Sequence, residues 1–137
     1  MEVLNSYKYA CKAGSITCLT LFISWMFLPN ILFNIFAIEY NNYTIFLGQR
    51  IAALFFGLSI ILFFLANENN ARVQKILSVS FAISCLILAY SGVTGLQNGA
   101  AGIGILIAII VELFFAFWFF YSTWKISFSI LINETNE

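Results

Sequence analysis

Residues 76–111 read ILSVSFAISCLILAYSGVTGLQNGAAGIGILIAIIV and contain no charged side chain. As a single α-helix this run would be about 54 Å long, whereas the hydrocarbon core of a bilayer is about 30 Å thick. The run must therefore fold back on itself. We predict the turn at residues 91–104, where five glycines and two neighbouring amide side chains favour a reversal. Membrane-spanning helices are expected on either side of it, at about 76–95 and 100–124.

The composition of the whole chain supports a membrane environment. Of its 137 residues, 62% are hydrophobic and only 9% are charged, whereas a soluble domain carries about 25% charged residues. A globule of this size cannot bury so much apolar surface, so we expect the lipid bilayer to cover it. The net charge of zero provides no basic surface for binding nucleic acid.

The charged residues divide the rest of the chain into two further spans. We place them at about 10–28 and 44–66, the second of which ends at the polar stretch NENNARVQK, 67–75. Pro29 lacks the N–H that a continuing helix would need, so the first span should end or kink there. The apolar segment that follows, at about 30–38, is too short to span and is predicted to form a short interfacial helix.

The predicted fold is therefore all-α: a polytopic membrane protein with four transmembrane helices in an up-down bundle, in one domain covering 1–137. Four spans bring both termini to one side. Positive residues favour the cytoplasmic side, and one orientation places five of the six basic residues there: Lys8, Lys12, Lys75, Lys125 and Arg72. We thus predict a multi-pass protein of the inner (cytoplasmic) membrane with cytoplasmic N- and C-termini.

Small residues allow helices in lipid to approach closely, and three spans carry small or polar residues at helical spacing. The last span has Gly104, Ala108, Glu112 and Ala116 at intervals of four. The second has Arg50, Ala53 and Gly57, and the third has Ser80 and Ser84. We predict that these residues form the helix-packing faces, so that Glu112 points into the bundle.

Glu112 is also the main candidate for a functional group, because ionisable residues inside a membrane are costly and often functional. It lies about 16 Å along its helix from Ala101, and Arg50 lies about 9 Å along its helix from Thr44. The difference of about 7 Å is within reach of an arginine side chain. We therefore hypothesise that Arg50 and Glu112 form an ion pair, which either fixes the helix register or forms part of a ligand site.

Five further polar residues of the outer half could complete such a site: Asn34, Gln49, Tyr90, Thr94 and Gln97. Histidine is absent, which removes the commonest metal ligand and general base. The three cysteines, Cys11, Cys18 and Cys85, have no spacing typical of a metal site or a disulfide framework. We predict neither a cofactor nor a metal.

The order of these features resembles the small bacterial four-helix membrane proteins of the DoxX-like group. The resemblance lies in a first helix ending in LPNILFNIFAI, then LGQRIAALFFGLSIILFFLA, a polar R-x-x-K loop, a third helix ending in SGV, and an aromatic last helix. It implies the four-helix architecture. Some members are associated with membrane oxidoreductases and quinone-linked sulfur chemistry, but no catalytic motif of that chemistry is visible in this sequence.

Three functions fit the sequence to different degrees. The leading interpretation is a non-catalytic integral membrane protein, either an accessory subunit or a lipid- or quinone-adjacent binding bundle, whose partner is another membrane protein or a second copy of itself. The alternative is a small proton-coupled transporter that uses Glu112. A membrane enzyme is disfavoured, because Tyr90, Cys85 and Glu112 form no recognised catalytic set.

Overall fold

The computed structural model describes residues 2–39 and 41–134, with the side chains of 6–39 and 41–128. These residues form helices and the turns between them. In chain order the helices are α1 (Glu2–Phe27), α2 (Pro29–Phe36), α3 (Asn42–Leu65), α4 (Ala71–Gln97) and α5 (Ile105–Glu134). All except α2 are long and apolar enough to cross a membrane. The predicted all-α fold, with four candidate spans and a short helix after the first, is confirmed.

Most of the side chains on these four helices face outward. In the most apolar window of each candidate span, only 22% to 28% of the residues are buried inside the molecule. The exposed positions include many large apolar side chains, such as Leu54, Phe64, Phe117 and Trp124. Water would not tolerate a surface of this kind, so it implies a lipid bilayer and a multi-pass integral membrane protein.

Two asparagines set the starts of α3 and α4. The Asn41 side-chain oxygen accepts hydrogen bonds from the backbone N–H groups of Tyr43 and Thr44, at 3.0 and 2.9 Å. The Asn70 side chain does the same for the second and third residues after it. Because these bonds satisfy N–H groups that a helix start leaves unpaired, α4 can begin at Ala71 instead of the predicted residue 76.

The reversal between α4 and α5 is shorter than predicted and occupies residues 98–104. The chain stays helical to Gln97, so that Gly92 and Gly95 lie inside α4. At Gly99 φ is 71°, a left-handed conformation in which glycine has no steric penalty. The glycines of this segment thus have two uses, since some make the turn and others allow close helix packing.

The residues at its two ends explain where helix α2 starts and stops. Pro29 occupies the first turn, where its missing N–H leaves no hydrogen bond unmade. The helix ends at Phe36, and the capping residue after it, Ala37, has φ 49°. The N–H group of Ala37 donates to the carbonyl oxygen of Asn34, and that of Ile38 donates to the carbonyl oxygen of Phe33. The sequence prediction of a short helix after the proline is therefore confirmed.

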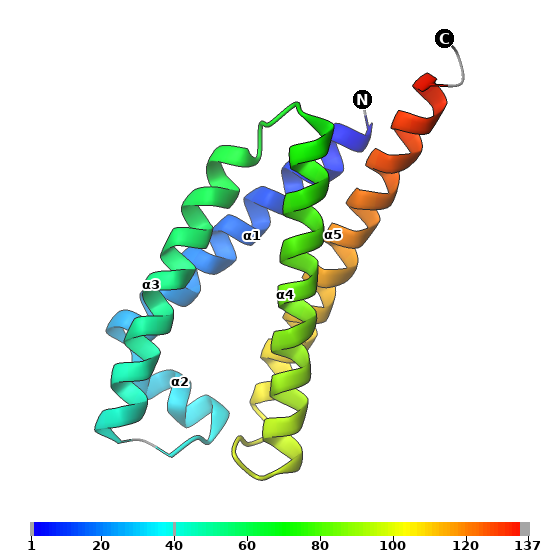
Figure 1. The fold of residues 1–137 in the computed structure, drawn as a ribbon. Coiled ribbons are helices and arrows are strands. Elements are labelled where there is room, and N and C mark those ends of the chain that lie inside the picture. The colour runs from blue at the N-terminus through cyan, green and yellow to red at the C-terminus, as the bar shows by residue number, and fades with distance from the viewer. Residues whose placement is uncertain (1, 40, 135–137) are drawn as a thin grey trace.

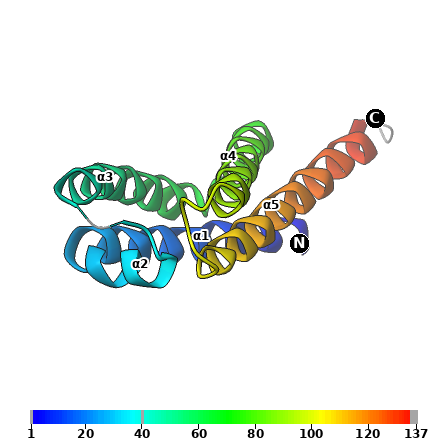
Figure 2. The same ribbon diagram turned by 90° about the horizontal axis from the view of Figure 1, so that it is seen from below.

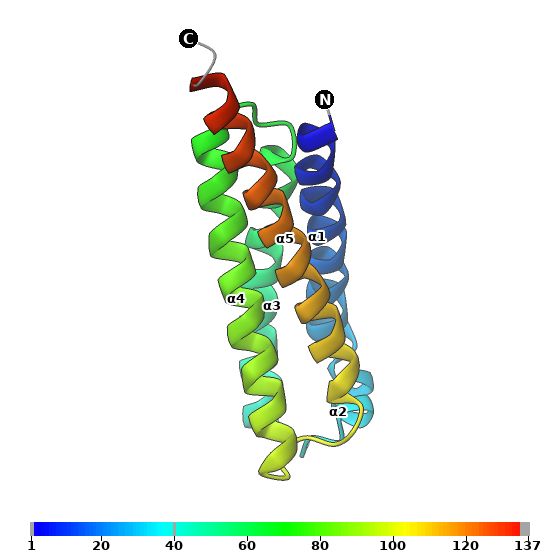
Figure 3. The same ribbon diagram turned by 90° about the vertical axis from the view of Figure 1, so that its right-hand side faces the viewer.

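The four long helices form two pairs. Helix α1 packs along α3, α4 packs along α5, and the pairs meet mainly where α1 crosses α5. Among the described residues, α3 and α4 do not pack along each other, although they are consecutive in the chain. Figure 1 shows the two pairs diverging toward α2, and Figure 2 shows them from below. The chain termini lie at the opposite end, called here the terminal end (Figure 3).

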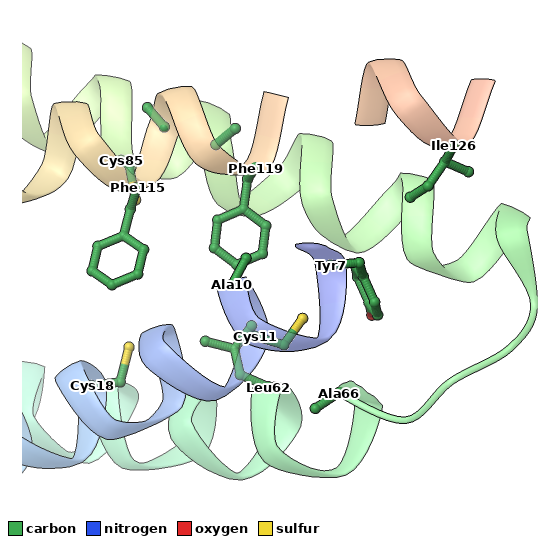
Figure 4. Packing of buried hydrophobic residues seen from close by; sticks show 12 residues of the cluster. Tyr7, Ala10, Cys11, Cys18, Leu62, Ala66, Cys85, Phe115, Phe119 and Ile126 are labelled. Carbon is green, nitrogen blue, oxygen red and sulfur yellow. The ribbon is translucent and has the colours of Figure 1, made fainter. Parts of the chain in front are cut away.

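The pairs are joined by a buried cluster toward the terminal end (Figure 4). Tyr7 of α1 and Phe119 of α5 are both fully buried there, together with Leu62 of α3. The Tyr7 hydroxyl donates a hydrogen bond to the carbonyl oxygen of Leu65, 3.0 Å away. This bond ties α1 to the last turn of α3, where helix carbonyl groups lack a partner within the helix.

A reciprocal serine pair holds α1 against α3 closer to the middle of the bundle. The Ser15 hydroxyl donates to the carbonyl oxygen of Ser59 at 2.9 Å, and the Ser59 hydroxyl donates to that of Ser15 at 3.0 Å. Both side chains are buried. Polar bonds of this kind between membrane helices contribute about 0.6 kcal/mol each on average.

At the end opposite the termini, called here the α2 end, α2 joins the two pairs. The N–H of Gly102 donates to the carbonyl oxygen of Phe36 at 2.6 Å. Gly104 lies so close to α2 that a Cβ atom on it would overlap the backbone carbonyl of Ile35. The backbone can make this approach only because residue 104 has no side chain.

We expect Gly104→Ala to lower the free energy of unfolding by about 1–3 kcal/mol, because the added methyl group collides with backbone that cannot rotate away. Gly57→Ala is the matched control. A Cβ at Gly57 meets no atom within 4 Å, and alanine is favoured over glycine in a helix by about 0.5–1 kcal/mol. Reversible unfolding in mixed micelles measures both variants, and equal effects of the two would contradict this contact.

Candidate functional site

Glu112 lies on α5 where two cavities meet. The larger cavity has a volume of about 310 Å³ and extends from Glu112 toward the α2 end, between α4 and α5. The smaller has a volume of about 60 Å³ and lies among α1, α3, α4 and α5. Glu112 and Leu88 are the two described residues that line both. The carboxyl group, which is partly buried, thus stands at the junction of the two spaces.

The larger cavity has mainly apolar and small side chains in its wall. Ala108 of α5 and Gly92 of α4 lie on either side of it, and Ile38, after α2, lies at the far end. Apart from Glu112, the only side chain with a polar group among its described lining residues is Ser91. A few polar groups in an apolar concave wall are typical of sites for small lipophilic ligands.

The smaller cavity is lined by residues of α1, among them Thr17, and by three phenyl rings, one from each of α3, α4 and α5: Phe55, Phe81 and Phe115. The Phe81 and Phe115 rings meet edge to face, with centroids 6.5 Å apart. Cys18 and Cys85 also line the space, and Figure 4 shows the Cys18 sulfur directed toward Phe115. All three cysteines are buried and free, and Cys18 and Cys85 contribute their thiols to the wall of this cavity.

The structure does not bring Arg50 and Glu112 together. Arg50 is exposed on α3, and its guanidinium carbon lies 5.6 Å from the centroid of the Phe46 ring. Among the described side chains, no salt bridge joins Arg50 to Glu112. The separation follows from the orientation of α3: Arg50 is on the opposite side of this helix from Gly48 and Ala52, which are buried against α1.

The predicted packing residues fall into two groups. Gly104, just before α5, approaches α2; on α5 itself, Ala108 and Glu112 line the larger cavity and Ala116 is buried in the core. On α3 and α4 the structure uses other faces. The predicted residues Ala53, Ser80 and Ser84 are exposed, and nothing lies near the missing Cβ of Gly57. The buried small residues of these helices are instead Gly48, Ala52, Ser59, Ser78, Ala82 and Ala89.

None of the five supporting polar residues is among the described residues that line either cavity. Four of them are exposed: Asn34, Gln49, Tyr90 and Gln97. Thr94 is partly buried, and its hydroxyl donates to the carbonyl oxygen of Ser91 within α4. The structure therefore does not assemble these residues around Glu112.

Several lining residues were not predicted from the sequence. Leu88, Ser91 and Cys18 line the cavities, but each looks like an ordinary residue of an apolar helix. The sequence gives a signal for Ser91 alone, because this residue precedes Gly92, the glycine at which α4 and α5 come close. No described set of three or more His, Cys, Asp or Glu side chains is arranged to hold a metal ion.

Comparison with protein-family models, with curated proteins and with solved structures gave no match to this chain.

The ion-pair hypothesis is tested by a double-mutant cycle of Arg50→Gln and Glu112→Gln. With Arg50 over Phe46 and Glu112 at the cavity junction, we expect the two changes in unfolding free energy to add within about 0.5 kcal/mol. Unfolding of the four proteins in mixed micelles provides the measurement. A coupling energy well above that value would restore the predicted pair.

Proposed function

We propose that this protein is a non-catalytic membrane binding bundle that takes a lipophilic ligand from the bilayer into the two cavities beside Glu112. The observation that carries the proposal is the position of Glu112. It is the one described lining residue with a side-chain charge, and it lies where the two cavities meet, whose other described polar side chains are the hydroxyl groups of Ser91 and Thr17. A carboxyl group in such surroundings is costly, and intramembrane ionisable groups commonly mark ligand or ion sites.

The size of the larger cavity fits this role. Its 310 Å³ falls at the lower end of the range of about 300–1,000 Å³ found for small-molecule sites. The engineered apolar cavity that holds benzene in another protein measures about 150 Å³. The larger cavity therefore has room for a lipid head group or a ring, whereas the smaller, at 60 Å³, does not.

The arrangement of the helix pairs supports entry from the side. Helices α3 and α4 do not pack along each other in the described structure, and they diverge toward the α2 end (Figure 1). Phe55 of α3 and Phe81 of α4 both line the smaller cavity. Leu88 of α4 is exposed as well as lining both cavities. A ligand dissolved in the bilayer could reach Glu112 by this route without crossing water.

The ligand class and the cellular setting extend the sequence predictions. We propose membership of the DoxX-like group, some members of which are associated with membrane oxidoreductases and quinone-linked sulfur chemistry, and an accessory role beside another membrane protein. We also propose the inner membrane with cytoplasmic termini. The support is that the basic residues Lys8, Lys12, Arg72, Lys75 and Lys125 belong to the terminal portions of α1, α4 and α5 at one end of the bundle.

The proposal predicts that Ala108→Phe blocks binding, because its ring would project into the larger cavity. We expect labelling of residues 88–112 by a diazirine-bearing long-chain alcohol, in lipid nanodiscs, to fall about tenfold, equivalent to about 1.4 kcal/mol. Peptide mass spectrometry locates the label. Ala53→Phe is the control, since Ala53 is exposed on the outer face of α3. Equal labelling of all lipid-facing segments, unchanged in Ala108→Phe, would contradict the proposal.

A proton-coupled transporter is the second candidate, favoured by the same junction at Glu112, since one carboxyl group reaches both cavities. In this case a pH gradient across proteoliposomes would drive uptake or release of a lipophilic substrate. Glu112→Gln should abolish the gradient-driven component, while Glu39→Gln, at an exposed position, should retain it. Ligand binding without any gradient-driven flux would leave the binding bundle as the function.

A further inference from the structure

We propose that Glu112 selects the head group of the ligand, and that the two cavities together take a single-chain amphiphile. Its head group is non-anionic and donates hydrogen bonds, as in a long-chain amine or alcohol. This inference rests on the proposed function and adds to it the chemical class of the ligand. It follows from the charges around the two cavities, from the position of Glu112 between them and from their sizes.

The charges around the two cavities favour a head group that donates hydrogen bonds over an anionic head group. Glu112 is the sole charged side chain among the described residues that line the two cavities. Arg50, the basic residue of α3, lies over Phe46 on the exposed side of its helix and does not line either space. The two cavities therefore offer no cation to a phosphate or carboxylate, whereas an ammonium or hydroxyl group can donate to the Glu112 carboxyl group.

The position of the polar groups indicates where the head lies. Ser91 and Glu112 both line the larger cavity, Ser91 from α4 and Glu112 from α5. Ser91 supplies a neutral hydroxyl group that can accept or donate a second hydrogen bond. Thr17 of α1 supplies a hydroxyl group in the smaller cavity. Because the larger cavity has more room, at 310 Å³ against 60 Å³, we assign the head group to the larger cavity, between Ser91 and Glu112.

The smaller cavity fits a chain and excludes a ring. Its 60 Å³ is well below the roughly 150 Å³ of a cavity that holds benzene, and the rings of Phe55, Phe81 and Phe115 line it together with residues of α1. We place the first part of a polymethylene chain in this space, beside Leu88, because Leu88 lines both cavities and is itself exposed. The small volume favours one chain over the two of a diacyl lipid.

Equilibrium binding of radiolabelled dodecylamine, dodecanol and dodecanoate to the protein in phosphatidylcholine nanodiscs tests this assignment, with binding to empty nanodiscs subtracted. We expect saturable binding in the order dodecylamine, dodecanol, dodecanoate. Glu112→Gln should weaken dodecylamine about tenfold or more, as for the loss of a charged hydrogen bond, and dodecanol by less than about threefold. Glu39→Gln, the matched control at an exposed position, should leave all three unchanged.

The order of the three affinities in the unmodified protein tests the head-group assignment even if Glu112→Gln does not fold. Dodecanoate binding as tightly as dodecylamine overturns the head-group assignment, as does an unchanged dodecylamine affinity in a folded Glu112→Gln variant. Saturable binding that is lost in Ala108→Phe but shows no head-group preference overturns this inference and leaves the proposed function standing. No saturable binding of any of the three compounds to the unmodified protein overturns both.

Discussion

The contact between α1 and α5 toward the terminal end determines the shape of the rest of the molecule. Tyr7 and Phe119 are fully buried there, and Tyr7 also bonds to the last turn of α3. Each helix pair is held along its length by its own packing, but the pairs meet each other mainly at this crossing and again where α2 contacts the α4–α5 turn. Between these two attachments the pairs are free to enclose a space without filling it.

That space explains why a carboxyl group is tolerated in the apolar helix α5. Glu112 points neither into a close-packed core nor fully into lipid, but stands at the junction of two cavities in the bundle. The helix pairs that form the walls leave α3 and α4 unpacked against each other. A site with this access suits a molecule dissolved in the bilayer, and its single carboxyl group gives the binding of such a molecule a preferred orientation.

The sequence predicts the positions of the spans well, but it predicts poorly which side of each helix packs inward, and the reason is physical. Spans follow from length and charge, and the helix after Pro29 follows from proline chemistry. Facing in a soluble helix follows from which side is polar, but both sides of a membrane helix are apolar, so the residues alone do not distinguish them. Arg50, Ala53 and Gly57 do share one side of α3, yet the structure turns that side outward and packs Gly48 and Ala52 inward. Glu112 could be singled out as an unusual charge, whereas Leu88 and Ser91 acquire their roles only from the helix pairing.

The most direct test of the account is a structure of the protein in lipid nanodiscs at a resolution that shows bound lipid. We expect two helix pairs with α3 and α4 apart, and chain-like density that enters between them and reaches Glu112. A closed bundle, in which α3 packs along α4 and the space beside Leu88 and Glu112 is filled by side chains, would contradict it.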